Sequence, residues 1–215
     1  MWGGFLPEGV ALACADPRER PPGLMPEEAA QVAAAVPRRQ QEFAHGRALA
    51  RRLLGQLGIE NFALLIGPHR EPRWPAGVVG SVTHTETLCA VAVAPGSRYA
   101  GLGIDLEPDE PLEPELAVHI ATPGELAETA NAGLPDPGVG ARLVFSAKEA
   151  VYKCQFPATG RRLAFADVTI LLEAGGTFRI KFDRDMADLA PAAALEGRWM
   201  RGGGLLFTAA WWAYP

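Results

Sequence analysis

The sequence predicts an α+β protein built from two lobes of similar size. Helical patterns precede strand patterns in each half of the chain, and residues 108–114, which are acidic and contain three prolines, separate the halves. The 215 residues are 48% hydrophobic, which is enough to bury a core in two small fused halves. We therefore expect an N-terminal lobe over residues 1–107, a linker over 108–114 and a C-terminal lobe over 115–215.

The first half should contain one short strand and two helices before its main sheet. The strand is expected over 10–15, and the helices over 26–36 and 38–57. A proline in the first turn and two glutamates at the N-terminal end favour the first helix. Pro37 is expected to break the chain between the helices, and Gly58 to end the second helix.

Four strands are expected next, with a stiff loop between the first two. Their apolar composition predicts strands over 62–66, 78–84, 88–94 and 99–107. The loop contains three prolines, which deny it regular structure. Arg70 lies in this loop, and an arginine on a stiff loop loses less freedom when it binds an anion.

The second half is organised around a long helix that contains residues 145–153. Its apolar residues recur at i, i+3, i+4 and i+7, so one stripe should face a core. That stripe consists of Leu143, Val144, Ala147, Ala150, Val151 and Cys154. Glu149 lies off the stripe, next to Lys148 and one turn before Lys153, which places a carboxylate between two ammonium groups near the surface. Pro157 should end the helix.

The other elements of the second half are short. Two helices and a loop rich in Gly and Pro are expected before the long helix, over 115–120, 124–131 and 133–140. Three strands separated by glycine turns are expected after it, over 168–172, 177–182 and 205–212.

Composition limits the class of partner. The net charge of −5 and a pI of about 5.4 argue against a general nucleic-acid binder. Residues 37–84 nevertheless carry seven Arg against three Glu, a local net charge of +4, which indicates one small polyanion as a ligand. Three widely spaced cysteines indicate reduced thiols in a cytoplasmic protein, and no run approaches the roughly 18 apolar residues of a membrane span.

Two acidic residues at the end of a predicted strand indicate a metal site. Asp105 and Glu107 are two residues apart, so their side chains share one face of the strand while Leu106 points into the core. With Glu149 from the long helix they offer three carboxylates, which suit Mg²⁺ with phosphate oxygens in its remaining positions. The alternative is an acidic strand end in solvent beside an ordinary Glu149–Lys153 pair on a helix surface.

Another polar strand end precedes these carboxylates. Ser81 and Thr83 are two residues apart, so two hydroxyls share a strand face that suits a phosphate. His84 follows them, although a lone His is more often a surface residue. Gly101-x-Gly103 lacks the third glycine and the following helix of a dinucleotide-binding loop, and no His or Cys spacing supports a zinc site.

Five short motifs occur in one order along residues 38–156. They are Glu42-Phe43-Ala44-His45-Gly46-Arg47, Arg70-Glu71-Pro72-Arg73-Trp74-Pro75, Gly80-Ser81-Val82-Thr83-His84, Gly103-Ile104-Asp105-Leu106-Glu107 and Phe145-Ser146-Ala147-Lys148-Glu149-Ala150-Val151-Tyr152-Lys153. Each motif is weak alone, but the ordered set is specific. The chain resembles 4′-phosphopantetheinyl transferases of the Sfp type, in particular the branch that serves enterobactin-like synthases.

The resemblance implies two pseudo-symmetric α+β lobes with the active site, and coenzyme A, in the cleft between them. Mg²⁺ would be held by Asp105, Glu107 and Glu149. The phosphates of coenzyme A would be contacted by His84 and Lys153, and its adenosine end with the 3′-phosphate by Arg47 and Arg70, with Arg39 as a further candidate. Two positions differ from the usual family pattern and keep its chemistry: Thr83, a cofactor-binding residue where the family often has Ser, and Phe145, where it often has Trp.

The implied reaction moves phosphopantetheine from coenzyme A to a serine of an apo acyl or peptidyl carrier protein and releases adenosine 3′,5′-bisphosphate. Glu149 is the expected general base, directly or through a metal-bound water, and Lys153 or His84 would steady the leaving phosphate. The implied protein is a monomer, and its carrier belongs to siderophore or other nonribosomal peptide, polyketide or fatty-acid synthesis. Two alternatives stay open, a Mg²⁺-dependent phosphohydrolase and a non-catalytic module that binds coenzyme A or a carrier domain.

Overall fold

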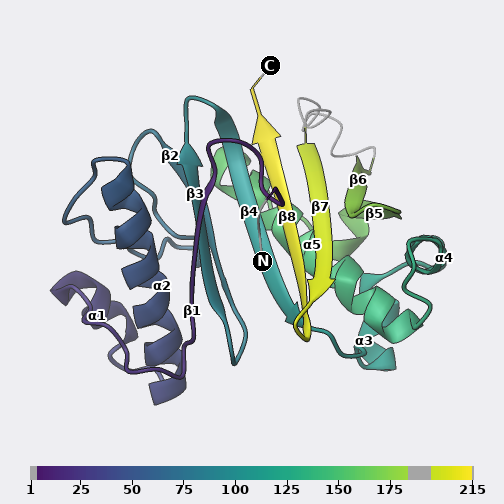
Figure 1. Cartoon of the computed structure of the whole chain (residues 1–215), viewed down its shortest axis with the longest axis horizontal. Helices are drawn as coiled ribbons and strands as arrows, with labels where there is room; N and C mark the ends of the chain where they lie inside the picture. Colours follow the sequence, from purple (N-terminus) through teal and green to yellow (C-terminus); the bar gives the residue numbers. More distant parts are fainter. Residues whose placement is uncertain (1–3, 184–194, 215) are drawn as a thin grey trace.

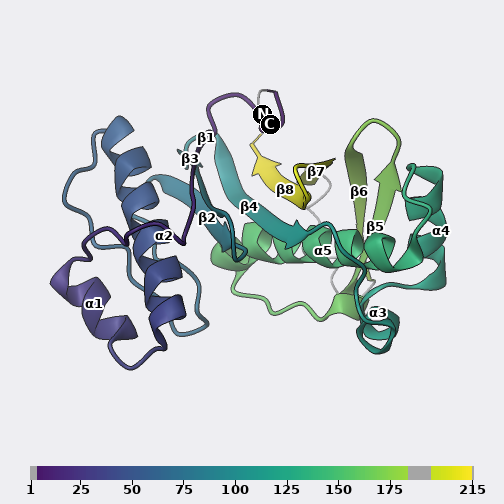
Figure 2. The same ribbon diagram turned by 60° about the horizontal axis from the view of Figure 1, so that its bottom comes forward.

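The computed structural model describes residues 4–183 and 195–214 and contains two antiparallel β-sheets with their own helices (Figure 1). This architecture confirms the predicted α+β class. Figure 2 shows α1 and α2 at one end of the molecule and α3, α4 and α5 around the larger sheet at the other. Within the described residues, no helix combines the length and the apolar character needed to cross a membrane.

The smaller sheet belongs to the first half of the chain. Its strands lie in the order β1 (Ala11–Ala15), β3 (Cys89–Pro95) and β2 (Val78–His84). Helix α2 (Pro37–Gln56) covers one face, and α1 (Pro26–Val32) packs against α2. The leucines of α2 share a core with alternate residues of β3, so this sheet is buried beneath the helix.

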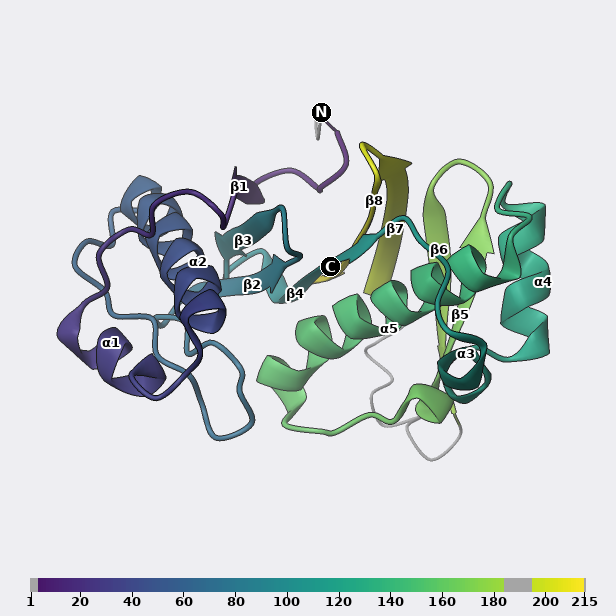
Figure 3. The same ribbon diagram turned by 90° about the horizontal axis from the view of Figure 1, so that it is seen from below.

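The larger sheet has five strands in the order β4-β8-β7-β6-β5. These strands are β4 (Tyr99–Pro108), β5 (Val168–Glu173), β6 (Thr177–Phe182), β7 (Leu195–Gly202) and β8 (Leu205–Ala213). The helices of this half are α3 (Pro114–Ile120), α4 (Pro123–Asn131) and α5 (Pro137–Thr159), with a 3₁₀ turn, η1 (Phe165–Asp167), before β5. Figure 3 shows α5 running along the sheet until its C-terminal end approaches the first half of the chain.

Strand β4 serves two cores because its side chains alternate. Leu102, Ile104 and Leu106 are buried against residues of β3 and β8. Gly101 and Gly103 lie on the other face, where a Cβ atom at either position would overlap the backbone of α5. The two glycines therefore allow close helix–strand packing, which explains the Gly-x-Gly pattern without a dinucleotide.

Two hydroxyls join the sheets at the edge of β4. The Ile104 amide donates to Ser81 Oγ at 3.1 Å, and the Leu106 amide donates to Thr83 Oγ1 at 3.2 Å. Strand β2 thus satisfies the free edge of β4 with side chains rather than with a backbone ladder. This arrangement holds the ends of both strands together, and both ends carry residues predicted for the site.

Most predicted elements are confirmed, and the differences have local causes. No strand forms over 62–66, where a single bridge from Ile66 to Pro72 closes the stiff loop.

Pro37 and Pro137 begin α2 and α5, since the fixed φ of proline suits the first helical position. Pro157 lies inside α5, which ends two residues later at Thr159 and is followed by a left-handed Gly160 with φ 68°. Strand β7 was not predicted because arginines and glycines interrupt its apolar pattern.

The segment predicted as a linker connects two elements of the same half. Strand β4 pairs with β8 along its length, and α3 begins at Pro114. Residues 109–113 between them form no helix or strand, and the guanidinium of Arg142 binds the Glu110 and Pro111 carbonyls. The lobe boundary at 107–108 stays a prediction, and the pairing of β4 favours a division in the turn between β3 and β4 instead.

Candidate active site

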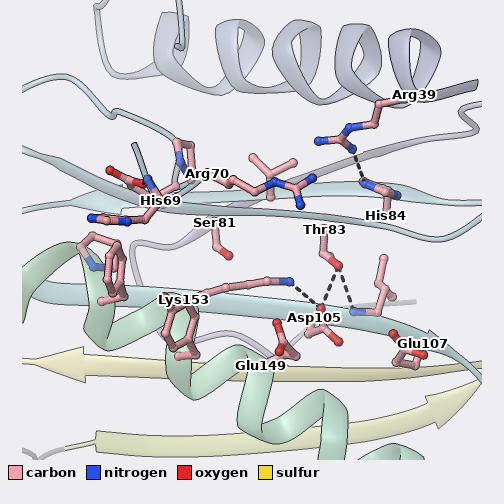
Figure 4. A pocket seen from close by; sticks show the side chains of 18 residues that line it. Arg39, His69, Arg70, Ser81, Thr83, His84, Asp105, Glu107, Glu149 and Lys153 are labelled. Carbon is pink, nitrogen blue, oxygen red and sulfur yellow. Dashed lines mark hydrogen bonds and ion pairs between the residues drawn. The ribbon is translucent and has the colours of Figure 1, made fainter. Parts of the chain in front are cut away.

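A cavity of about 400 Å³ lies where the two sheets meet (Figure 4). Strands β2 and β4, helix α5 and the stiff loop around Arg70 form its walls, and α2 contributes Arg39. Eight of the nine predicted site residues line it, namely Arg39, Arg70, Thr83, His84, Asp105, Glu107, Glu149 and Lys153. Residues that are up to 114 positions apart in the sequence therefore share one cavity.

Asp105 lies at the centre of the polar wall. It is 4% exposed, and its Oδ1 accepts hydrogen bonds from Lys153 Nζ at 2.6 Å and from Thr83 Oγ1 at 3.2 Å. Its Oδ2 accepts one from Ser146 Oγ at 2.9 Å. Three donors hold this carboxylate in a fixed orientation.

The other two carboxylates are less completely paired. Glu107 Oε2 accepts a hydrogen bond from Arg142 at 2.8 Å, whereas Figure 4 draws none from Glu149 to the residues around it. Burial raises the pKa of both glutamates, and the charge of Asp105 adds to the rise while Lys153 opposes it. A carboxyl group with a raised pKa is a better proton acceptor than an ordinary one, which suits Glu149 to the role of general base.

His84 lies between opposite charges at the end of β2. Burial lowers its pKa, Arg39 and Lys153 add to this shift, and Glu42 and Asp105 oppose it. The neutral ring accepts a hydrogen bond at Nε2 from the Arg39 guanidinium at 2.8 Å. His84 and Arg39 thus form a pair that can present positive charge to an anion in the cavity.

The loop around Arg70 is closed by its own backbone. The Gly67 amide donates to the Glu71 carbonyl at 2.7 Å, and Arg70 adopts a left-handed φ of 71°. Non-glycine residues occupy this region at a cost of roughly 1 kcal/mol or more, so the turn is held by its surroundings. His69 packs edge-on against Phe156 of α5, which fixes the loop against the helix at the cavity wall.

Arg47 is the predicted site residue that the structure places elsewhere. It is 5% exposed, its guanidinium lies 3.9 Å from the ring centre of Phe43, and burial lowers its pKa to about 10. Its role at the adenosine end stays a prediction. Arg51 of the same helix pairs with the buried Glu28, so only part of the basic segment faces the cavity.

The carboxylates suit Mg²⁺ in chemical type but are not gathered into a preformed metal site. Within residues 4–183 and 195–214, no group of three or more His, Cys, Asp or Glu side chains is arranged to hold a metal ion. Lys153 and Arg142 supply the positive charge next to Asp105 and Glu107. The raised pKa values of Glu107 and Glu149 nevertheless show that added positive charge would stabilise this wall.

Several residues of the site were not singled out from the sequence. Tyr152 and Phe156 stack at 5.2 Å on the cavity side of α5, and both fall one or two turns from Glu149, so helical spacing could have indicated them. Arg142 and Thr208 carry no local signal, because each reaches the site through a partner distant in sequence.

Lys148 was expected beside Glu149 at the surface, and this expectation is wrong. Its side chain is 4% exposed and turns into the second half of the chain, where it pairs with Glu125 at 3.0 Å. Neighbouring residues of a helix point about 100° apart, so Lys148 and Glu149 serve different faces of α5.

The chain is similar to a known family of proteins. Residues 27–94 match the 4′-phosphopantetheinyl transferase N-terminal domain, and residues 101–201 match the 4′-phosphopantetheinyl transferase superfamily. The chain is 42% identical to the 4′-phosphopantetheinyl transferase Svp of Streptomyces mobaraensis over 86% of this chain and 77% of that protein. It is 37% identical to the 4′-phosphopantetheinyl transferase PptT of Mycobacterium tuberculosis over 92% of this chain and 91% of that protein.

A third relative represents the enterobactin branch. The chain is 36% identical to enterobactin synthase component D of Escherichia coli, over 58% of each protein. The two family matches together take in every predicted site residue. The chain therefore belongs to the 4′-phosphopantetheinyl transferase superfamily and is an enzyme of that family.

Proposed function

We propose that this enzyme transfers 4′-phosphopantetheine from coenzyme A to a serine of an apo acyl or peptidyl carrier protein, with Mg²⁺, and releases adenosine 3′,5′-bisphosphate. One observation carries the proposal: three carboxylates from β4 and α5 line a single cavity together with Lys153, His84 and two arginines. Coenzyme A is a polyanion, so its phosphates require cationic side chains. A carrier serine requires a proton acceptor next to those phosphates.

The carboxylates would hold the metal. Asp105, Glu107 and Glu149 are the proposed ligands because they are the acidic side chains on β4 and α5 that line the cavity. When bound, Mg²⁺ supplies positive charge to the pyrophosphate oxygens. Lys153 and Arg142 pair with Asp105 and Glu107 and offset part of the negative charge of this wall.

Lysine, histidine and arginine side chains would bind the phosphates. Lys153 and His84 lie on either side of Asp105, and Arg39 extends the positive charge towards α2 (Figure 4). Arg70 lines the same cavity from a left-handed turn, and the 3′-phosphate of the adenosine end would bind to it. Thr83 and Arg47 are kept as proposed cofactor contacts, although the Thr83 hydroxyl now binds β4.

The proposed reaction is an in-line displacement at the β-phosphorus of coenzyme A. The carrier serine oxygen forms a bond to phosphorus, and the bond between phosphorus and the bridging pyrophosphate oxygen breaks. Glu149 takes the serine proton, as its raised pKa favours. Lys153 and His84 stabilise the charge on the departing adenosine 3′,5′-bisphosphate.

The name of one relative indicates a class of carrier protein to test. The name of the enterobactin relative points to a siderophore synthase, so carrier domains of nonribosomal peptide synthesis are the first partners to test. A cytoplasmic monomer remains the proposed state of the protein.

The test is direct. The purified protein is incubated with coenzyme A, Mg²⁺ and an apo peptidyl carrier protein, and the intact carrier is weighed by mass spectrometry. A gain of one phosphopantetheine that disappears with chelator, and that Asp105→Asn abolishes, supports the proposal. Cleavage of coenzyme A with unmodified carrier would instead establish a hydrolase, and binding of coenzyme A without either product a non-catalytic module.

A further inference from the structure

A pair of buried hydroxyls connects Asp105 to the interior of the protein. Ser146 of α5 and Thr208 of β8 are both 0% exposed, and their oxygen atoms lie 2.8 Å apart. Ser146 Oγ also lies 2.9 Å from Asp105 Oδ2, and Thr208 Oγ1 lies 2.9 Å from the Ser146 carbonyl oxygen. The three residues come from three different elements that meet only in the folded chain.

The surroundings make these hydroxyls unusual. The face of β8 towards α5 reads Leu206, Thr208 and Ala210, and both neighbours of Thr208 belong to the apolar core of the larger sheet. A valine of the same shape would fill this space without a polar atom to satisfy. In the register of the sheet, Thr208 lies directly opposite Asp105, so its hydroxyl stands beside that residue of β4.

The number of hydroxyl protons decides which of the two residues donates a hydrogen bond to Asp105. An ionised carboxylate only accepts hydrogen bonds, so the single proton of Ser146 must go to Asp105. The Ser146 oxygen is then free to accept, and the Thr208 proton lies within reach of both that oxygen and the Ser146 carbonyl. In the orientation in which Thr208 donates to Ser146 Oγ, its hydroxyl polarises that of Ser146 and strengthens the hydrogen bond to Asp105.

We propose that Ser146 and Thr208 are positioning residues for phosphopantetheine transfer, because their hydroxyls form a donor relay that holds the Asp105 carboxylate in the orientation the cavity requires. The inference rests on the proposed function. It assigns Thr208 no contact with substrate, because a side chain with no exposed surface acts on the reaction only through Ser146 and Asp105.

Four variants test the relay in the full-length protein. They are Ser146→Ala, Thr208→Val, their combination and Thr208→Ser. Thr129→Val is the matched control, because Thr129 is also 0% exposed and donates to the Leu126 carbonyl, within α4. The readouts are kcat for carrier modification, the Mg²⁺ concentration for half-maximal rate, coenzyme A binding by calorimetry, and the melting temperature.

The relay predicts a defined order of effects. Ser146→Ala should lower kcat about 10- to 100-fold and raise the Mg²⁺ requirement, as loss of a partner that orients a metal ligand commonly does. Thr208→Val should do so by a smaller factor, Thr208→Ser should restore near-wild-type kinetics, and the double variant should be no worse than Ser146→Ala. Thr129→Val should change only the melting temperature.

Two results would overturn the relay. Wild-type kinetics in Ser146→Ala and Thr208→Val, beside an inactive Asp105→Asn, would leave the proposed function standing and refute the relay. Equal kinetic losses in Thr129→Val would show a general effect of core polarity. Failure of the wild-type protein to modify any carrier is a separate result, because it would remove the proposed function itself.

Discussion

Lys148 and Lys153 lie on the same helix and each pairs with a carboxylate, yet the two pairs differ in almost every other respect. The side chains of Lys148 and Glu125 are 4% and 0% exposed, whereas the side chains of Lys153 and Asp105 are 28% and 6% exposed. Lys148 Nζ also donates to the carbonyls of Ile120 and Phe165, each at 2.8 Å. We call these the interior pair, Lys148–Glu125, and the cavity pair, Lys153–Asp105.

The two pairs differ in what surrounds them. Glu125 accepts hydrogen bonds from the amides of Ile170 and Thr122 in addition to Lys148, so the interior pair joins α4, α5 and β5. The cavity pair lies beside the cavity and beside Glu149. Figure 4 draws no hydrogen bond or ion pair from Glu149 to the residues around it. A buried pair enclosed by the protein specifies structure, while a pair beside an open cavity and a third carboxylate is suited to bind a ligand.

The largest expected effect comes from the least satisfied member of the cavity wall. Glu149→Gln should reduce carrier modification roughly 10²- to 10⁴-fold, because it removes the proposed proton acceptor and keeps the side-chain volume. Intact-mass kinetics measure the loss, and circular dichroism should show an unchanged fold. Glu60→Gln, at an exposed position, is the control and should leave the rate unchanged. Substantial residual activity at saturating Mg²⁺ would contradict the assignment of Glu149 as base.

Replacing each lysine by methionine should have different effects on stability and on the transfer rate in the two pairs. Lys148→Met leaves Glu125 charged and buried, which typically costs about 3–5 kcal/mol of unfolding free energy. Lys153→Met removes a partly exposed lysine and leaves Asp105 the hydroxyls of Thr83 and Ser146, so it should cost less stability than Lys148→Met and yet lower the transfer rate. Urea denaturation and carrier modification measure the two effects. Equal stability losses in both variants would refute the distinction drawn here.

The close packing of α5 on β4 offers a smaller test. A Cβ atom at position 103 would overlap the Ala150 carbonyl and lie 2.6 Å from the Cys154 amide nitrogen, so Gly103→Ala should cost about 1–3 kcal/mol. It should also lower activity, because it moves Glu149 away from Asp105. Gly202→Ala is the matched control, since nothing lies within 4 Å of its added methyl group. Thermal unfolding of both variants gives the comparison, which fails if they are equally stable.

The smallest effect concerns pH. The pKa of His84 is lowered in the folded protein, so the unfolded chain binds a proton first as the pH falls through 6.5. The folded state should therefore lose stability from this pH down to the lowered pKa, and His84→Gln should remove that part of the loss. Urea titrations of both proteins between pH 5 and 8 (about the working range of histidine) measure it. A parallel pH dependence in the two proteins would show that His84 does not contribute.

Local patterns predicted much of the fold and of the site. The stripe from Leu143 to Cys154 is fully buried as its spacing indicates, and Asp105 shares a face with the two glycines while Leu106 enters the core. Helix and strand periodicity fix which face a residue occupies, so these predictions needed no knowledge of the partner element. Strand β7 lacks such a pattern, so it was not predicted. The strand expected over 62–66 does not form, because this segment leads into a loop stiffened by prolines.

The sequence by itself determined the family and most of the residues that line the cavity, because five ordered motifs carry the chemistry along the chain. Only the tertiary structure decided what each charged or polar side chain meets. Lys148 turned away to Glu125, Arg47 was buried against Phe43, and Thr208 came to lie opposite Asp105. Such contacts join segments that are distant in sequence, and they depend on sheet register and helix packing, which no local pattern records.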